Sequence, residues 1–583
     1  MPKDSKKTVA IDYTSRDFSS IRDQLTQVAE RFYPDTFQDF SEASFGAMML
    51  DAVAYVGDQV SFYLDYNVNE TFLDTSYQRD NVVRHGRILG YKDSGRPSTY
   101  GKVALFVLVP ASETGLGPDT RYIPVIKRGT RFTSQNGLNF VLTDNVDMAE
   151  SSNPVVVATT DPTTGAPTQY AIKSYGNVVS GFFNVEEVEC GAFERFKSIQ
   201  LNSANVSEII SVFDSDGNEY FEVEYLSQDT VFKELSNKNY KNDNTPSVIK
   251  PMLVNRKFIT VFDGNGVTLQ FGSGDELAAE LVVTDTTFDP SRLVNNKYYG
   301  IVPQNTTLTI AYRQSNPINS NVAATSLNTV ASSLLEFEDA SVLAGATLTT
   351  VRNSLEVINE EPIMGNVSNP STAEIKQRIY DTFPTQNRAV TQQDYENLVY
   401  RMPAKFGSIK RCSVQKDPDS QKRNLNVYVV SEDPQRKLIN TNTTIKTNLK
   451  TWLNHYRMIN DTIDILDPFI INFGINFIIK PERNVDKFKV LDSCVVALSN
   501  EFSSPLFIGE SISKSNIFNV LNGVSGVNDV VKVQIINKTS VNYSNVFFSI
   551  SDNVSPDGDM IVCPKNAIFE MKFPEVDIKG KLR

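Results

Sequence analysis

The hydrophobic pattern of the chain changes character near residue 95, and this change limits the possible folds more than any other feature. Before it, apolar residues between 45 and 63 recur at helical spacings, after N-cap candidates at 41–44. We expect a long helix from about residue 43 and a second at 75–89 that ends at Gly90, a plausible C′ residue. After it, short β-rich runs alternate with Gly, Pro, Asn and Asp, which predicts a separate β domain.

The rest of the chain divides further, because 583 residues exceed what one hydrophobic core holds. From about residue 341 helices and strands alternate, and the last part is typical of a small separate domain. The predicted fold class is α+β and multidomain, with a central β-rich domain and C-terminal α/β and small α+β domains. The expected domains are a helical domain at 1–95, a β-rich domain at 96–340, an α/β domain at 341–465 and an α+β domain at 466–583.

Local patterns fill in these domains. In the β-rich part, strands are expected at 103–109, 131–133 and 140–143, and hairpins at 209–226, turning at Asp216-Gly217, and at 263–271. Segments 151–168 and 315–328 are rich in Ser, Thr, Asn and Pro, which predicts exposed loops or arms. In the C-terminal part the expected helices and strands are, in chain order, 372–383, 391–400, 424–430 (strand), 443–456, 470–480 (strand), 490–502, 513–521 and 530–536 (strand).

The long N-terminal helix carries apolar residues on more than one stripe, wider than the ~100° that packing against one core requires. Two interpretations remain open. The helix is either the centre of a core within this chain or part of a bundle shared with partner chains. The second interpretation gives these candidate interface residues: Phe45, Met49, Val53, Val56 and Val60.

Composition excludes several classes of protein. The net charge of −13 argues against a general affinity for nucleic acid. The longest apolar strings fall far below the ~20 residues of a membrane span, and the N-terminus lacks the pattern of a signal peptide. The 4 cysteines lie tens of residues apart, which fits neither a disulfide framework nor a zinc site and favours a reducing compartment for assembly.

No pattern in the sequence predicts catalysis, a cofactor or a bound metal. The 2 histidines, His85 and His455, stand in predicted helices without Cys or carboxylate neighbours at ligand spacing. The glycine pairs at 264–266 and 272–274 lie between predicted strands, where tight turns are expected rather than a phosphate cradle. The acidic segments 214–218 and 557–559 do not continue into a calcium loop. We therefore expect a protein that is not an enzyme.

Several segments resemble the baseplate J-like wedge proteins of contractile phage tails. The resemblance rests on the helical segments 46–59, 69–76 and 89–91, on the β segments 123–132 and 269–275, on the Arg-Ala-Val-Thr…Asp-Tyr segment at 387–399, and on segments 509–515 and 523–530. In the most specific of these, Thr391 and Asp394 have the spacing of a capping box, so the motif first predicts a helix start. Segment 359–366 lacks the double glycine of simple J proteins, and the long β region favours the larger wedge subunit.

The resemblance implies a structural role in the virion tail baseplate, assembled in the host cytoplasm. It implies N-terminal helices that join a bundle with other wedge subunits, and C-terminal domains that dimerise into a ring around the central hub and transmit the change that triggers sheath contraction. Sheath-initiating or hub-proximal proteins are the other implied partners, with no nucleic acid and no membrane insertion.

Two alternatives come from other classes of protein. A receptor- or glycan-binding tail protein would use the 35 Phe and 23 Tyr, although Trp452 is the single Trp and fibrous repeats are missing. A tail lysin would need paired carboxylates in a groove, and no pair stands out in the sequence.

Overall fold

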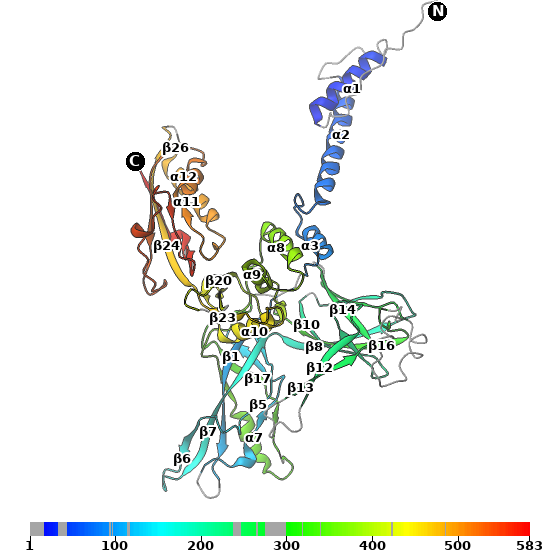
Figure 1. Ribbon diagram of the computed structural model, residues 1–583, viewed down its shortest axis with the longest axis vertical. Helices are drawn as coiled ribbons and strands as arrows, with labels where there is room; N and C mark the ends of the chain where they lie inside the picture. The colour runs from blue at the N-terminus through cyan, green and yellow to red at the C-terminus, as the bar shows by residue number, and fades with distance from the viewer. Residues whose placement is uncertain are drawn as a thin grey trace, which may run out of the picture. The chain divides into compact units, whose positions relative to one another are not determined.

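The computed structural model describes residues 17–32, 44–92, 95, 97–112, 117–203, 205–236, 247–263, 266–274, 299–316, 319–338, 340–420, 424–483 and 485–583. It divides into two units, one containing the chain up to Lys92 together with Pro370–Phe383, the other containing Asp93–Asn369 and Pro384–Arg583. The fold is mixed α+β and multidomain, as the sequence predicted: N-terminal helices, β-rich central sheets and mixed α/β sheets at the C-terminal end (Figure 1).

The first unit is helical. Its elements are α1 (Phe18–Phe32), α2 (Phe45–Glu70), α3 (Arg79–Ile88) and most of α8 (Thr372–Thr385). Helix α2 begins at Phe45 because the Ser44 side chain accepts the N–H of Ala47 at 3.1 Å. The predicted second helix begins later than residue 75, because the Glu70 carboxylate accepts the N–H of Tyr77 at 2.8 Å and holds the preceding residues in a turn. It ends at Ile88, and Gly90 takes a φ of +88°, as expected of a C′ glycine.

Helix α8 joins α3 in this unit, although it is distant in the sequence. Ile375 and Ile379 of α8 form a buried cluster with Val82 and Tyr91. Gly86 permits the contact, since a Cβ there would lie 2.8 Å from the Cδ1 of Ile379. The Lys376 ammonium also donates to the Asp74 carbonyl at 2.7 Å. The core of the helical unit is therefore completed by α8, which follows the β-rich region in the sequence.

We expect Ile379→Ala to destabilise this helical unit by about 2–4 kcal/mol, because the change removes buried apolar atoms and leaves a cavity. Hydrogen exchange of α3 and α8 in the full chain would show the loss as faster exchange. Phe383→Ala on the same helix is the control, because that ring is 66% exposed and its removal should change exchange little. Equal effects of the two variants would contradict the packing described here.

The first large sheet of the second unit is antiparallel, in the order β17-β3-β4-β7-β1-β19 with β6 paired to β7. Its end strands β17 and β19 contact each other, so it curls around the core, and α7 (Gly345–Asn353) adds Leu348 and Val351 to that core. The strands are β1 (Tyr100–Pro110), β3 (Arg131–Ser134), β4 (Asn139–Leu142), β6 (Val155–Thr160), β7 (Pro167–Ser180), β17 (Leu327–Ser332) and β19 (Glu356–Ile358). A small sheet beside it contains β2 (Val125–Ile126), β5 (Val146–Asp147) and β18 (Leu335–Glu336).

The second large sheet has the order β8-β16-β10-β11-β14-β15-β9. Its strands are β8 (Phe182–Cys190), β9 (Ser198–Gln200), β10 (Val206–Phe213), β11 (Glu219–Glu222), β14 (Lys257–Asp263), β15 (Gly266–Phe271) and β16 (Thr306–Gln314). Both predicted hairpins are confirmed as antiparallel pairs, and Gly217 has the positive φ, +81°, that the first turn requires. Residues 264–265 of the second turn lie outside the described residues. Strands β12 (Thr230–Ser236) and β13 (Ser247–Leu253) form a separate ribbon.

The two polar segments have different outcomes. Segment 151–168 is an exposed arm, the hairpin of β6 and the start of β7. The prediction that 315–328 is an exposed loop or arm was wrong about its exposure, because Ser320 and Asn321 are buried. The Asn321 amide donates to the carbonyls of Asn366 at 2.7 Å and Glu432 at 2.8 Å, so these polar residues satisfy backbone groups inside the unit.

The C-terminal part contains two further sheets. One has β20 (Arg411–Lys416), β21 (Asn424–Glu432), β22 (Leu438–Asn440) and β23 (Thr462–Leu466), covered by α9 (Gln392–Tyr400) and α10 (Thr443–Asn454). The other has β24 (Phe469–Pro481), β26 (Val527–Asn537), β28 (Ala567–Glu570) and β29 (Ile578–Leu582). Residues of α11 (Lys487–Glu501) and α12 (Lys514–Asn522) pack into the core of this second sheet.

The predicted capping box is confirmed, since Thr391 accepts from the Asp394 N–H at 3.1 Å and the Asp394 carboxylate accepts from the Thr391 N–H at 2.8 Å. The described residues also form short elements: η1 (Thr120–Tyr122), η3 (Ala404–Phe406), β25 (Ile512–Ser513), η4 (Ser551–Asn553), β27 (Met560–Ile561) and α13 (Pro574–Asp577).

Candidate assembly interface

One side of α2 packs on α1 through small and charged residues. Ala54 is fully buried, and a Cβ on Gly57 would lie 3.2 Å from the Cδ1 of Ile21. Arg22 and Asp51 form an ion pair at 2.6 Å. Small side chains at this contact let the two helices approach closely, which fixes the side that α2 turns toward its own chain.

The candidate interface residues lie on the opposite side of α2. Their spacings of three and four residues place them along one side of a helix with 3.6 residues per turn, away from Ala54. They are all half exposed or more: Phe45 74%, Met49 50%, Val53 52%, Val56 59% and Val60 51%. Among the described residues this apolar side has no cover.

The exposed apolar surface is larger than the sequence-based choice of residues. Further exposed apolar and aromatic side chains on α2 are Met48, Tyr55, Phe62, Tyr63, Leu64 and Val68. Phe62 and Tyr63 pack edge to face, with ring centroids 5.9 Å apart. Met48, Tyr55 and Phe62 recur every seven residues and form a second stripe beside the first, and Tyr63 continues the first stripe beyond Val60. Helical periodicity alone could have found these residues. We name the whole set of exposed apolar α2 residues, from Phe45 to Val68, the α2 face.

Among the described residues, the α1–α2 pair buries few side chains, namely Ala47, Ala54 and Glu70 of α2. Helix α1 has no buried residue, and Phe32 is 61% exposed. Contiguous apolar patches above a few hundred Å² are rare on monomeric proteins and mark interaction sites. The geometry therefore favours an element that completes its packing against another chain.

The residues considered for chemistry have structural surroundings. The Nε2 of His85 lies 2.9 Å from the Glu70 carbonyl, and His455 is the C-cap residue of α10. Hydrogen bonds from Asn81 and from the Tyr77 N–H hold the pKa of Glu70 below its usual value. Within the described ranges, no group of three or more His, Cys, Asp or Glu side chains is placed to hold a metal ion. None of the described helices is both long and apolar enough to cross a membrane.

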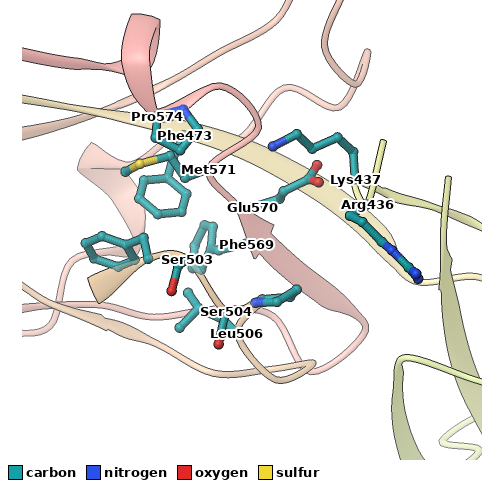
Figure 2. A pocket seen from close by; sticks show the side chains of 12 residues that line it. Arg436, Lys437, Phe473, Ser503, Ser504, Leu506, Phe569, Glu570, Met571 and Pro574 are labelled. Atoms are coloured by element: carbon teal, nitrogen blue, oxygen red, sulfur yellow. The ribbon is translucent and has the colours of Figure 1, made fainter. Parts of the chain in front are cut away.

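A cavity of about 70 Å³ lies between the β21–β22 turn and the sheet that contains β24 and β28, lined among others by Arg436, Lys437, Phe569 and Glu570 (Figure 2). Ligand sites usually measure ~300–1,000 Å³, so this cavity is too small for a substrate or cofactor. Beside it, the Glu570 carboxylate accepts the Leu438 N–H at 2.7 Å and the Asn472 amide at 2.7 Å. Glu570 thus links the two C-terminal sheets.

This link predicts a pH dependence. Burial raises the pKa of Glu570 above its usual value, against the hydrogen bonds from Leu438 and Asn472 and the charges of Lys572 and Lys437. A raised pKa means that protonation favours the folded state, so this stabilising effect is present below the unfolded pKa near 4.5 and is lost as the pH rises through the folded pKa.

The Glu570→Gln substitution mimics the protonated acid. We therefore expect the melting temperature of this variant, relative to that of the wild type, to be higher at pH 7 than at pH 4. Thermal melting of both proteins at the two pH values measures this difference. Glu575→Gln is the control, because the Glu575 side chain is exposed. A melting difference that is independent of pH would contradict the role of Glu570.

A comparison with protein families points to the same end of the chain. Residues 17–88 match the family model described as bacteriophage baseplate protein, N-terminal domain, a segment that contains α1, α2 and α3. A search of curated proteins found no match. The N-terminal helical segment, with the whole α2 face, is thus similar to that domain of phage baseplate proteins.

Two solved structures are also similar, at a distance. A chain of the anti-feeding prophage (AFP) baseplate, solved by cryo-EM with six-fold symmetry, is 9% identical with a TM-score of 0.26, covering 95% of this chain and 90% of that one. A chain of the type VI secretion system TssK-TssF-TssG baseplate subcomplex is 9% identical with a TM-score of 0.23, covering 72% of this chain and 96% of that one. At these TM-scores the likeness carries no argument about function.

Proposed function

We propose that this chain is a structural subunit of a contractile-tail baseplate. The observation that carries the proposal is the α2 face, exposed within the segment that matches the N-terminal domain of phage baseplate proteins. An apolar helix face of this kind gains stability when another helix removes it from water, at roughly 25 cal/mol per Å² buried. The function is assembly, in which side chains bind neighbouring subunits rather than a substrate.

The finer proposal is a wedge subunit, with a likeness to gene product six of the T-even phages. In this role the α2 face enters a helical bundle with other wedge subunits. Copies of the chain dimerise and form the ring around the central hub, in contact with sheath-initiating or hub-proximal proteins. The support for this step is the resemblance of the sequence segments, above all the capping-box segment that starts α9.

The connections between the two units suggest how a wedge subunit would transmit movement. The chain passes between the units after Lys92, after Asn369 and after Phe383, because α8 returns to the helical unit. A partner that displaces α2 therefore acts on a unit whose α3 and α8 are packed together through Ile375 and Ile379. Because the chain crosses between the units at three points, a displacement of the helical unit would be transmitted to the second unit through each of these connections.

Deletion of the gene from the genome that encodes the particle tests the proposal. A baseplate subunit is required for assembly, so we expect lysates without it to contain no complete contractile tails by electron microscopy, and complementation to restore them. A receptor- or glycan-binding tail protein would give a different result, namely complete particles that fail to adsorb. Normal, contractile and adsorbing particles without this chain would overturn the proposal.

A further inference from the structure

Strand β6 (Val155–Thr160) is an edge strand that pairs with β7 alone among the described strands. All of its residues are exposed, and its three valines, Val155, Val156 and Val157, are 45%, 64% and 43% exposed. Figure 1 shows the β6–β7 ribbon extending beyond the rest of its sheet. An exposed apolar edge offers a row of backbone groups to another strand.

The hydrogen-bond pattern identifies which backbone groups face outward. The Lys173 N–H donates to the Pro154 carbonyl at 3.1 Å, so residues 154 and 173 form a hydrogen-bonded pair. Hydrogen-bonded and non-hydrogen-bonded pairs alternate in an antiparallel ladder, and Val155 is opposite Ile172. The N–H and C=O of Val155 and Val157 therefore point away from β7, toward the free edge.

The edge of β6 lacks the charges that usually prevent strands from pairing. Residues 151–160 contain no Asp, Glu, Lys or Arg. By contrast β8, the end strand of the second large sheet, carries Glu186, Glu187 and Glu189. Charged side chains on an edge strand oppose the addition of another strand. The glutamates therefore protect β8 from pairing with another chain, whereas β6 has no such protection.

Hydrogen bonds within the arm stabilise its turn. Its turn is closed by the Asp161 N–H, which donates to the Ala166 carbonyl at 2.8 Å, and by the Asp161 carboxylate, which accepts the Thr163 N–H at 2.8 Å. The hydroxyls of Thr159 and Thr168 lie 2.9 Å apart across the two strands. A preformed arm loses little conformational entropy when it binds.

We propose that β6 pairs in an antiparallel manner with β6 of a second copy of this chain. Charge selects this occupant: in a chain of net charge −13, the neutral edge is a surface on which two copies meet without like-charge repulsion. A two-fold axis at Val156 places Val155 of one copy opposite Val157 of the other, so that the outward N–H and C=O groups of both residues gain partners. Such a pairing uses the same edge on both copies and closes on itself. It does not depend on the baseplate role.

A cross-link tests the pairing directly. With the axis at Val156, the two Val156 residues form a non-hydrogen-bonded pair with Cα atoms about 4.5 Å apart, which suits a disulfide. All four native cysteines are buried, so an introduced thiol is the reactive one. We expect Val156→Cys in the full chain, oxidised with diamide, to give a disulfide-linked dimer on a non-reducing gel. The matched control is Val185→Cys on β8, a valine that is 59% exposed and directly precedes Glu186 and Glu187.

A second pair of variants separates strand pairing from mere contact. In the Val156→Cys background, Val157→Pro removes an outward N–H without breaking the ladder to β7, and Val157→Thr keeps that N–H. We expect the Pro variant to reduce the rate of cross-linking by about tenfold or more and the Thr variant to preserve it. Equal rates for Val156→Cys and Val185→Cys, rapid cross-linking in the Pro variant, or loss in the Thr variant would each overturn the proposal.

Discussion

We expect Val53→Asp to abolish co-assembly of this chain with its neighbouring baseplate subunits while its N-terminal helices stay folded. Val53 is 52% exposed at the centre of the α2 face, so a carboxylate there remains hydrated in the free chain. In the proposed bundle the same carboxylate would be buried without a partner, which costs several kcal/mol, or a loss of affinity of about a thousandfold or more. Met49→Asp and Val56→Asp should act in the same way.

The neighbouring Ala54 supplies the matched control. Ala54 is fully buried in the described structure, so Ala54→Asp should disturb the helical unit itself and lower its helix content by circular dichroism. Co-purification with the other subunits, measured beside the melting curve of each variant, separates the two effects. If Val53→Asp unfolds the unit as Ala54→Asp does, the alternative of a helix packed wholly within this chain is correct. If Val53→Asp assembles normally, the α2 face is not an interface.

The second large effect is expected from Glu432→Ala in the C-terminal part. Glu432 is 1% exposed and Lys410 is 8% exposed, and the two form an ion pair at 3.1 Å. Ser368 donates its N–H to the same carboxylate at 2.7 Å, and Arg436 lies 3.2 Å from it. Removing one partner of a buried pair leaves the other charge poorly compensated, which costs about 3–5 kcal/mol.

Hydrogen exchange of residues 408–441 in the full chain measures this loss. The double variant Lys410→Met/Glu432→Leu should recover part of it, because apolar residues can replace a buried pair as a whole. Burial raises the pKa of Glu432, but the charge of Lys410 and the bonds from Ser368 outweigh it and hold the pKa below its usual value. The stabilisation is therefore present above the unfolded pKa near 4.5 and is lost as the pH falls through the folded pKa. Unchanged exchange in Glu432→Ala would refute the importance of the pair.

The candidate site was partly visible in the sequence. The wide apolar pattern of 45–63 predicted α2 and named part of its exposed face, because helical periodicity is a property of neighbouring residues. The same pattern could not say which side is covered within the chain. That depends on the contact of Gly57 with Ile21 and the ion pair of Arg22 with Asp51, which join separate helices.

Local sequence signals determined the secondary structure: Ser44 as the start of α2, Gly90 as the end of α3, the capping box of Thr391 and the turn at Gly217. Each involves residues within a few positions of one another, so the sequence alone contains the necessary information. Only the tertiary structure decided that α8 packs on α3, that the polar residues around Asn321 are buried, and that β6 is left as an open edge. These outcomes depend on which distant segments meet, and the free energy of such contacts comes from burial and pairing between residues that the local pattern does not connect.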